Sequence, residues 1–298
     1  MEDFKIWDSH VHLFPPEIYQ NWDKYAVLDE TFANLTRKPV DGKGTEEAWA
    51  DIEESLACAD KAGVWGLAMQ GWYWNDAGLQ RLHNDYMAQA LKDHPDRLKG
   101  FISINPKFGK ESLEEVERCA KLGFSGIGEL GPGGNGYDFN DPDFRALLEC
   151  AESLDLPVCI HCGEPVGHKY AGKDMTSLAP LPEIITTHPK LKLILAHMGG
   201  GMPFYEMNPK YQGLFENVRY DMAANPLLYC IRSIRVVIDA IGADRLLYGS
   251  DFPLLLYPRK NREADFTLFL DDIRNNAGLN EEEWKKIMGN NFLEFCGK

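Results

Sequence analysis

Short apolar runs alternate with longer amphipathic segments along the chain. Eight runs have the length and apolar content of buried strands, and they cover residues 4–8, 64–70, 98–104, 124–129, 158–161, 191–197, 218–223 and 246–251. Between them lie segments with apolar residues at helical spacing, such as Ile52, Leu56 and Ala59. These helical segments cover residues 46–62, 79–94, 112–122, 144–154, 182–188, 227–241 and 281–295. The pattern therefore predicts a regular alternation of strand and helix.

Strands that alternate with helices predict parallel βαβ units. Eight such units predict one α/β domain over residues 1–298, folded as a (β/α)8 TIM barrel with a parallel eight-stranded core. Segments 13–45 and 162–179 are longer than ordinary connections, so we expect long loops after strands one and five, the first of them lid-like. The alternative is an open, doubly wound sheet, which would keep the ends of strands one, five, six and eight apart.

Side chains that bind metals stand where the apolar runs end. His10 and His12 follow the first run, and they share a face because strand side chains alternate. Four later runs end in the same way, with Glu129, His161, His197 and Asp251. In a closed barrel the carboxyl ends of the strands form the face that carries active sites. Imidazole and carboxylate groups suit zinc and its first-row neighbours, so we expect a divalent metal site that holds zinc, as one or two ions.

Composition limits the partners of the protein. The net charge of −15 and the pI of about 5.0 disfavour binding to nucleic acid or to an anionic membrane, since both need basic surface. No apolar run approaches the ~20 residues that span a bilayer. The amino terminus has no signal-peptide pattern, and the seven cysteines are irregularly spaced, so we expect reduced thiols and a cytoplasmic protein. Cys159 and Cys162 form a C-x-x-C pair, but the sequence has no second such pair to complete a zinc site, so both are expected to pack in the core.

Four motifs together resemble the metal constellation of the amidohydrolase superfamily. They are Asp8-Ser9-His10-Val11-His12, Ile160-His161-Cys162, Ala196-His197-Met198-Gly199-Gly200 and Tyr248-Gly249-Ser250-Asp251-Phe252-Pro253. The last two are most similar to the amidohydrolase 2 branch, which includes aminocarboxymuconate-semialdehyde decarboxylase. The resemblance implies that His10, His12 and His161 are metal ligands and that Asp251 is both a ligand and a general base. Homodimers are common in the branch, which makes a homodimer an expectation here.

The roles of His197 and Glu129 remain open at this stage. In binuclear members of the superfamily the histidine that matches His197 binds a second metal, and in mononuclear members it is a free acid or base. The resemblance therefore implies one of these two roles for His197. Binuclear members place a bridging carboxylate at the end of strand four, where this chain has Glu129. A glutamate at this position is not a general feature of the decarboxylase branch, so this chain departs from that branch here. We interpret Glu129 as a metal contact that favours two ions, the alternative being a carboxylate that orients a neighbouring histidine or helix.

Other residues are candidates for contacts with a substrate. Trp72 follows the second strand and could form a wall against a planar molecule, its alternative role being packing under the lid. His168 and Lys173 lie in the loop after strand five and could hold a carboxylate. Lys169, Arg259 and Arg262 could do the same, although such side chains are usually solvated. The remaining histidines of the helical segments, His83, His94 and His188, are expected at the surface or at helix ends.

The first functional hypothesis is a metal-dependent hydrolase of a small carboxylated amide, lactone or ring compound. A zinc ion lowers the pKa of a bound water to about 7, Asp251 would handle the proton, and His197 would steady the developing oxyanion. The alternative is a non-hydrolytic decarboxylase or hydratase of a conjugated carboxylic acid, which would use the same ligands. A nuclease is disfavoured by the acidic composition, and a scaffold without catalysis by the intact ligand set.

Overall fold

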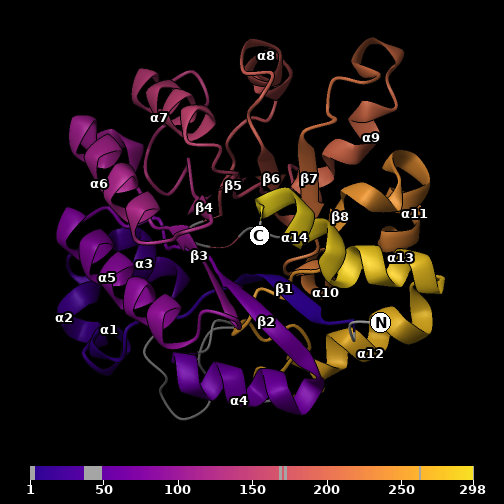
Figure 1. The fold of residues 1–298 in the computed structure, drawn as a ribbon, viewed down its shortest axis with the longest axis horizontal. Coiled ribbons are helices and arrows are strands. Elements are labelled where there is room, and N and C mark those ends of the chain that lie inside the picture. Colours follow the sequence, from indigo (N-terminus) through magenta and orange to yellow (C-terminus); the bar gives the residue numbers. More distant parts are fainter. Residues whose placement is uncertain (1–3, 37–48, 168–169, 171–172, 262, 298) are drawn as a thin grey trace.

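Eight parallel strands form the centre of the molecule, as Figure 1 shows for the computed structural model. The structure describes residues 4–36, 49–167, 170, 173–261 and 263–297. The strands pair in sequence order and are β1 (Ile6–Val11), β2 (Val64–Met69), β3 (Leu98–Ile102), β4 (Gly126–Leu130), β5 (Val158–Ile160), β6 (Leu193–Leu195), β7 (Val218–Asp221) and β8 (Leu246–Leu247). The first run is shifted relative to the prediction, so that His10 lies inside β1.

Bonds between the last strand and the first close the ring. The backbone nitrogen of Ser9 donates to the carbonyl of Tyr248 at 2.8 Å, and that of Asp251 donates to the carbonyl of His10 at 2.9 Å. Val11 and Phe252 form an isolated parallel bridge further along. The predicted TIM barrel is therefore confirmed, and the open sheet is excluded. The residues that end β8 are consequently bonded directly to the histidine pair of β1.

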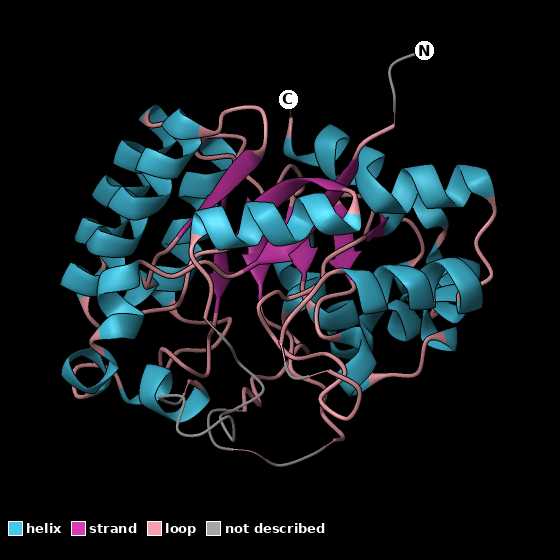
Figure 2. Ribbon diagram, turned by 90° about the horizontal axis from the view of Figure 1, so that it is seen from below, coloured by secondary structure: helices cyan, strands magenta, loops and turns pink. Residues whose placement is uncertain are grey.

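Helices pack around the strands (Figures 1 and 2), and the long loops gather on the side of the strands away from the termini (Figure 2). The main helices are α4 (Ile52–Ala62), α5 (Ala77–Asp93), α6 (Lys110–Lys121), α7 (Pro142–Ser153), α8 (Leu181–Thr187), α11 (Arg232–Ile241) and α12 (Thr267–Asn276). Local signals set their ends: Asp51 and Glu54 form a capping box at the start of α4, and Gly63 ends it at φ +75°. No helix in the described part of the chain is long and apolar enough to cross a membrane.

The two ends of the barrel are filled differently. At the amino-terminal end, helix α14 (Asn291–Cys296) covers the opening, and the ring of Phe292 lies 6.2 Å from Trp7 and 6.4 Å from Phe101. Cys159 is buried in this inner cluster, and Cys162 is buried in the layer between strands and helices, so both pack in the core as expected. The carboxyl-terminal end is left for polar side chains.

An aromatic cluster supports the loop after β1. Short helices α1 (Pro16–Gln20), α2 (Trp22–Ala26) and α3 (Glu30–Leu35) pack there on buried rings that include Phe14, Phe32 and Trp74. His83 of α5 belongs to this cluster, so its expected surface position is wrong. It is fully buried because the inner face of α5 turns toward Phe14, whose ring stacks on it at 5.7 Å. The other two histidines end helices as expected, His94 at α5 and His188 at α8.

The two hydrogen bonds of His83 define its tautomer. Trp74 donates its indole Nε1–H to Nδ1 at 3.1 Å, so the ring proton is on Nε2, which donates to the carbonyl of Leu13 at 2.8 Å. Burial lowers the pKa of His83 to about 4, despite the opposing effect of the bond to Leu13. A neutral His83 therefore ties the loop after β1 to helix α5.

We expect acid to weaken the fold through His83. The unfolded imidazole binds a proton near pH 6.5 and the folded one only near pH 4, so this stability is present above pH 6.5 and lost as the pH falls toward 4. The free energy of unfolding should drop by ~2 kcal/mol between pH 7 and pH 5 through this group. Urea unfolding of wild type and His83→Gln at both pH values measures it. His188→Gln is the control, and an unchanged pH dependence in His83→Gln would contradict the assignment.

Candidate metal centre

His10, near the end of β1, and His12, just after it, point into the carboxyl-terminal end of the barrel. Strand alternation places His10 and His12 on one face, and their Nε2 atoms lie 3.1 Å apart. His10 is fully buried and His12 almost so. Two ring nitrogens at this distance, each directed at the other, form the first half of a cation site.

Asp221, at the end of β7, fixes the tautomer of His10. Its Oδ2 accepts from His10 Nδ1 at 2.9 Å, and its Oδ1 accepts from the backbone nitrogens of His197 and Ala223 at 2.9 and 3.0 Å. An ionised carboxylate only accepts, so His10 carries its proton on Nδ1 and presents a lone pair at Nε2. Sequence reasoning did not single out Asp221, which lies inside the seventh predicted run, 218–223, and is the last residue of β7 only in the structure.

Glu129 stands between two pairs of histidines. Its Oε2 lies 3.8 Å from His10 Nε2 and 3.6 Å from His12 Nε2. Its Oε1 lies 3.1 Å from His161 Nδ1 and 3.2 Å from His197 Nε2. Each carboxylate oxygen therefore faces a different pair of ring nitrogens.

Asp251 completes the group around the β1 histidines. Its Oδ1 is 3.4 Å from His12 Nε2 and 3.6 Å from His10 Nε2, and its Oδ2 is 4.0 Å from His197 Nδ1. The φ of Asp251 is +67°, a left-handed conformation that a non-glycine residue adopts mainly at turns and functional sites. The structure thus brings together all six residues that the sequence proposed as metal ligands.

A left-handed turn after β6 sets the direction of His197. His197 and Met198 have φ values of +58° and +55°, and the glycines after them continue the same conformation. A Cβ at Gly199 would stand 2.6 Å from Cε1 of Tyr220, so the turn requires glycine there. Within this turn His197 Nδ1 donates to the carbonyl of Ala223 at 3.0 Å, which leaves Nε2 to face Glu129.

The charges of the cluster match a cation. Burial would raise the pKa of Asp251, but His12 and His10 outweigh it and lower that pKa to about 2. Burial would lower the pKa of His197, but the hydrogen bond and charge of Glu129 raise it to about 9. Asp251 therefore stays ionised, and His197 tends to hold a proton that balances the negative charge of the carboxylates. A bound metal ion would supply that positive charge instead.

The ligand spacing also fits a divalent metal. Ligand atoms ~2.1 Å from a shared ion lie roughly 3.0 to 3.4 Å apart at tetrahedral or octahedral angles. The separations around His10, His12, Glu129 and Asp251 run from 3.1 to 3.8 Å. Cys159 lies near His10 as well, but burial raises its pKa to about 12, which keeps the thiol protonated and makes it a poor ligand.

Aromatic rings line one side of the cluster. The ring of Trp72 lies 5.7 Å from that of His12 and stacks on Tyr73 at 4.9 Å. The Tyr73 ring in turn lies 6.3 Å from that of His161. Both side chains are buried. Trp72 therefore lies where a wall against a substrate was predicted, while it also packs under the loop after β1.

Two of the candidates for carboxylate binding, Lys173 and Arg259, lie within the described residues. Lys173 is half-buried, and its Nζ donates to Oε1 of Glu164 at 2.6 Å. Arg259 is exposed. His168, Lys169 and Arg262 lie outside the described residues.

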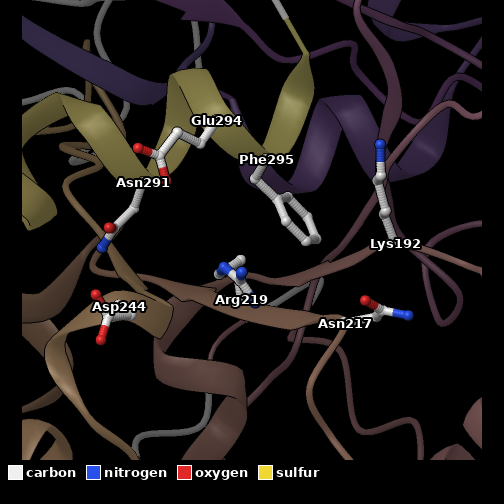
Figure 3. A pocket seen from close by; sticks show the side chains of 7 residues that line it. All are labelled: Lys192, Asn217, Arg219, Asp244, Asn291, Glu294 and Phe295. Atoms are coloured by element: carbon white, nitrogen blue, oxygen red, sulfur yellow. The ribbon is translucent and has the colours of Figure 1, made fainter.

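A pocket at the opposite end of the barrel lies away from these residues (Figure 3). It is formed by residues just before or at the start of strands β6 to β8 and by helix α14, among them Lys192, Arg219 and Glu294. Active sites of TIM barrels lie at the carboxyl ends of the strands. The ligand cluster, and not this pocket, is therefore the candidate active site.

Three similar proteins show what this chain resembles. A 2-amino-3-carboxymuconate-6-semialdehyde decarboxylase of Dictyostelium discoideum is 26% identical over 348 residues, which cover 97% of this chain and 91% of the relative. The crystal structure of a dihydroxybenzoic acid decarboxylase from Polaromonas sp. JS666, with bound manganese and the inhibitor 2-nitroresorcinol, is 20% identical, covers 98% of this chain and 96% of its own, and has a TM-score of 0.68. A 3'-5' ssDNA/RNA exonuclease TatD of Erwinia tasmaniensis is 28% identical over 222 residues, 71% of this chain and 77% of the relative.

The relatives favour the decarboxylase alternative over the hydrolase that we expected first, and they do not single out zinc as the metal. The family model described as amidohydrolase matches residues 7–295. That match spans the barrel from β1 to α14 and includes every candidate ligand. The chain therefore belongs to the amidohydrolase family, in the amidohydrolase 2 branch that its motifs resemble.

Proposed function

We propose that the protein is a metal-dependent decarboxylase of a small aromatic or otherwise conjugated carboxylic acid. The observation that carries this proposal is a buried cluster of candidate metal ligands beside the stacked rings of Trp72 and Tyr73. A planar acid can lie against such a wall with its carboxylate toward the ligands. The near full-length similarity to a decarboxylase supports the same chemistry.

His10, His12, Asp251 and Glu129 would hold the divalent metal. When bound, the ion would neutralise negative charge on the acid and orient its carboxylate. Imidazole and carboxylate ligands suit both manganese and zinc, so both ions belong in the test. Asp221 contributes by holding the His10 ring in the tautomer that offers Nε2.

Decarboxylation replaces a carbon–carbon bond with a carbon–hydrogen bond. A proton is added to the carbon that bears the carboxylate, the electrons of the breaking bond stay with that carbon skeleton, and carbon dioxide leaves. We assign the proton transfer to Asp251. Its Oδ1 lies within 3.6 Å of the Nε2 atoms of His10 and His12, and its Oδ2 lies 4.0 Å from His197 Nδ1. The ionised Oδ2 would take a proton from water and deliver it to the carbon that loses carbon dioxide.

The aromatic wall supports loss of carbon dioxide in preference to hydrolysis. Trp72 and Tyr73 are almost inaccessible to solvent, so they exclude water from one side of the cluster. A low-polarity wall disfavours a localised carboxylate charge more than the delocalised charge that builds up as carbon dioxide departs. Hydrolysis would in addition require an attacking water molecule at the same place.

We expect metal-dependent release of carbon dioxide from a conjugated acid. The protein, reconstituted with Mn²⁺ or Zn²⁺, would be tested with 2,6-dihydroxybenzoate, other hydroxybenzoates and unsaturated aliphatic acids, with product identified by NMR. Amides, lactones and a single-stranded oligonucleotide complete the panel. Activity should vanish with a chelator and return with the metal. Cleavage of an amide, lactone or oligonucleotide without release of carbon dioxide from any acid would overturn the proposed function.

We expect Asp221→Asn to weaken metal binding about 10- to 100-fold, because an amide cannot accept at both of its ends. The amide NH2 group of the variant would then face an N–H donor, either His10 Nδ1 or the backbone nitrogens of His197 and Ala223, and the hydrogen bonds on that side would be lost. Competition with a coloured chelator measures the dissociation constant. Excess metal should restore activity, which a loss of folding would not allow. Asp239→Asn, at an exposed position, is the control, and wild-type affinity in Asp221→Asn would refute the positioning role.

A further inference from the structure

We infer that the cavity at the amino-terminal end of the barrel binds a small dipolar molecule that carries both a carboxylate and an ammonium group, such as a free α-amino acid. Arg219 would bind the carboxylate, and Glu294 would bind the ammonium group. The cavity and the candidate metal centre lie at opposite ends of the barrel, so the inference is independent of the proposed decarboxylase function.

The cavity lies between helix α14 and the residues that begin strands β6 to β8. Its volume is about 180 Å³, which is the liquid volume of roughly six water molecules at ~30 Å³ each. A molecule of the size of glycine, alanine or serine therefore fits it. Four of its seven lining residues are charged, so a polar ligand suits it better than an apolar one.

The charges of the lining are separated along the cavity. In Figure 3, Lys192 lies on one side of Arg219, whereas Asp244 and Glu294 lie on the other side. A molecule in the cavity would therefore meet positive charge at one end and negative charge at the other. This arrangement is complementary to a dipolar ligand.

Two of the four charges lack a counter-ion. Lys192 and Asp244 each pair with a residue outside the cavity lining, at 2.9 Å in both cases. Arg219 and Glu294 form no ion pair within the described part of the chain, neither with each other nor with another residue. The cavity thus offers one uncompensated positive charge and one uncompensated negative charge.

The guanidinium group of Arg219 is held in place with one edge free. Its Cζ lies 4.5 Å from the centroid of the Phe295 ring, and its Nη1 donates to the carbonyls of Glu216 and Val218 at 2.8 and 3.1 Å. Nε is buried without a hydrogen-bond partner, and Nη2 makes no hydrogen bond to the described residues. Arginine binds a carboxylate through two parallel bonds of such an edge, so a carboxylate here would satisfy the buried Nε–H.

The surroundings of Arg219 also lack negative charge. Burial and the neighbouring Arg245 lower the pKa of Arg219, and the carboxylates of Asp244 and Glu294 offset this effect only in part. The chain has 46 acidic and 31 basic residues, so a half-buried arginine without a counter-ion is unexpected in it. The carboxylate of a ligand would supply the missing charge.

The acidic side of the cavity distinguishes a dipolar ligand from a simple anion. The carboxylates of Glu294 and Asp244 would repel a second negative group there, whereas they would attract an ammonium group. Asn291 lies on the same side (Figure 3), and its amide nitrogen donates to the carbonyls of Ala243 and Leu246 at 2.8 Å. Only its oxygen is left for a ligand, and that oxygen can accept from an ammonium group.

Isothermal titration calorimetry of the metal-loaded protein tests the inference. Glycine, L-alanine and L-serine are the dipolar probes, and acetate and ethylammonium carry one charge each. We expect an amino acid to bind about 10-fold or more tightly than acetate or ethylammonium, because each singly charged probe loses one charge-assisted interaction.

Two substitutions locate the ligand. Arg219→Gln and Glu294→Gln should each weaken binding of the amino acid about 10-fold or more. Arg259→Gln and Glu149→Gln, at exposed positions outside the cavity, are the matched controls and should bind it as the wild type does. Weaker binding in the first two variants places the ligand in this cavity and not at the metal centre, because both residues lie at the opposite end of the barrel.

Three results would overturn the inference. They are the absence of amino-acid binding at millimolar concentrations, equal affinity for acetate, and wild-type affinity in Glu294→Gln. Glu294 is exposed, so its substitution leaves the fold intact and decides the question even if Arg219→Gln does not fold. Release of carbon dioxide is measured separately and bears only on the proposed function.

Discussion

A buried carboxylate between four histidines is the constraint on which the centre depends. Glu129 is almost inaccessible to solvent, and an ionised carboxylate in such a place is costly unless positive charge or donors surround it. Its pKa is nevertheless held well below the usual value, because His161 and His10 outweigh the effect of burial. The rings that surround Glu129 therefore supply the favourable interactions that keep this buried group ionised.

Several distant segments cooperate to meet that need. Gly128 has a φ of +122°, and a Cβ there would collide with the carbonyl of Cys159, so the residue before Glu129 must be glycine. The left-handed turn at His197 and the carboxylate of Asp221 aim two more rings at the cluster. Helix α14 closes the other end of the barrel with apolar side chains, which confines polar chemistry to the carboxyl-terminal face.

The centre combines features that the chain's relatives suggest separately. The stacked rings of Trp72 and Tyr73 beside the histidines would suit the planar shape of the proposed acid. Glu129 adds two carboxylate oxygens to the same face, each directed at a different pair of histidines. One barrel can carry both the aromatic wall and the carboxylate because each strand end is an independent position that can hold a different side chain on a common scaffold.

The sequence by itself determined the architecture and pointed to the six residues that meet in the candidate metal centre. Strand and helix periodicities predicted eight βα units, and a parallel barrel then requires residues at strand ends, such as His161 and Asp251, to meet. It did not reveal Asp221, which acts through the tautomer of His10, nor the burial of His83 beneath the loop after β1. Both depend on contacts between residues 70 or more positions apart, which no local pattern records. Only the tertiary structure decided that the two oxygens of Glu129 face different histidine pairs, because that arrangement depends on the relative positions of strands β1, β4, β5 and β6 around the barrel axis.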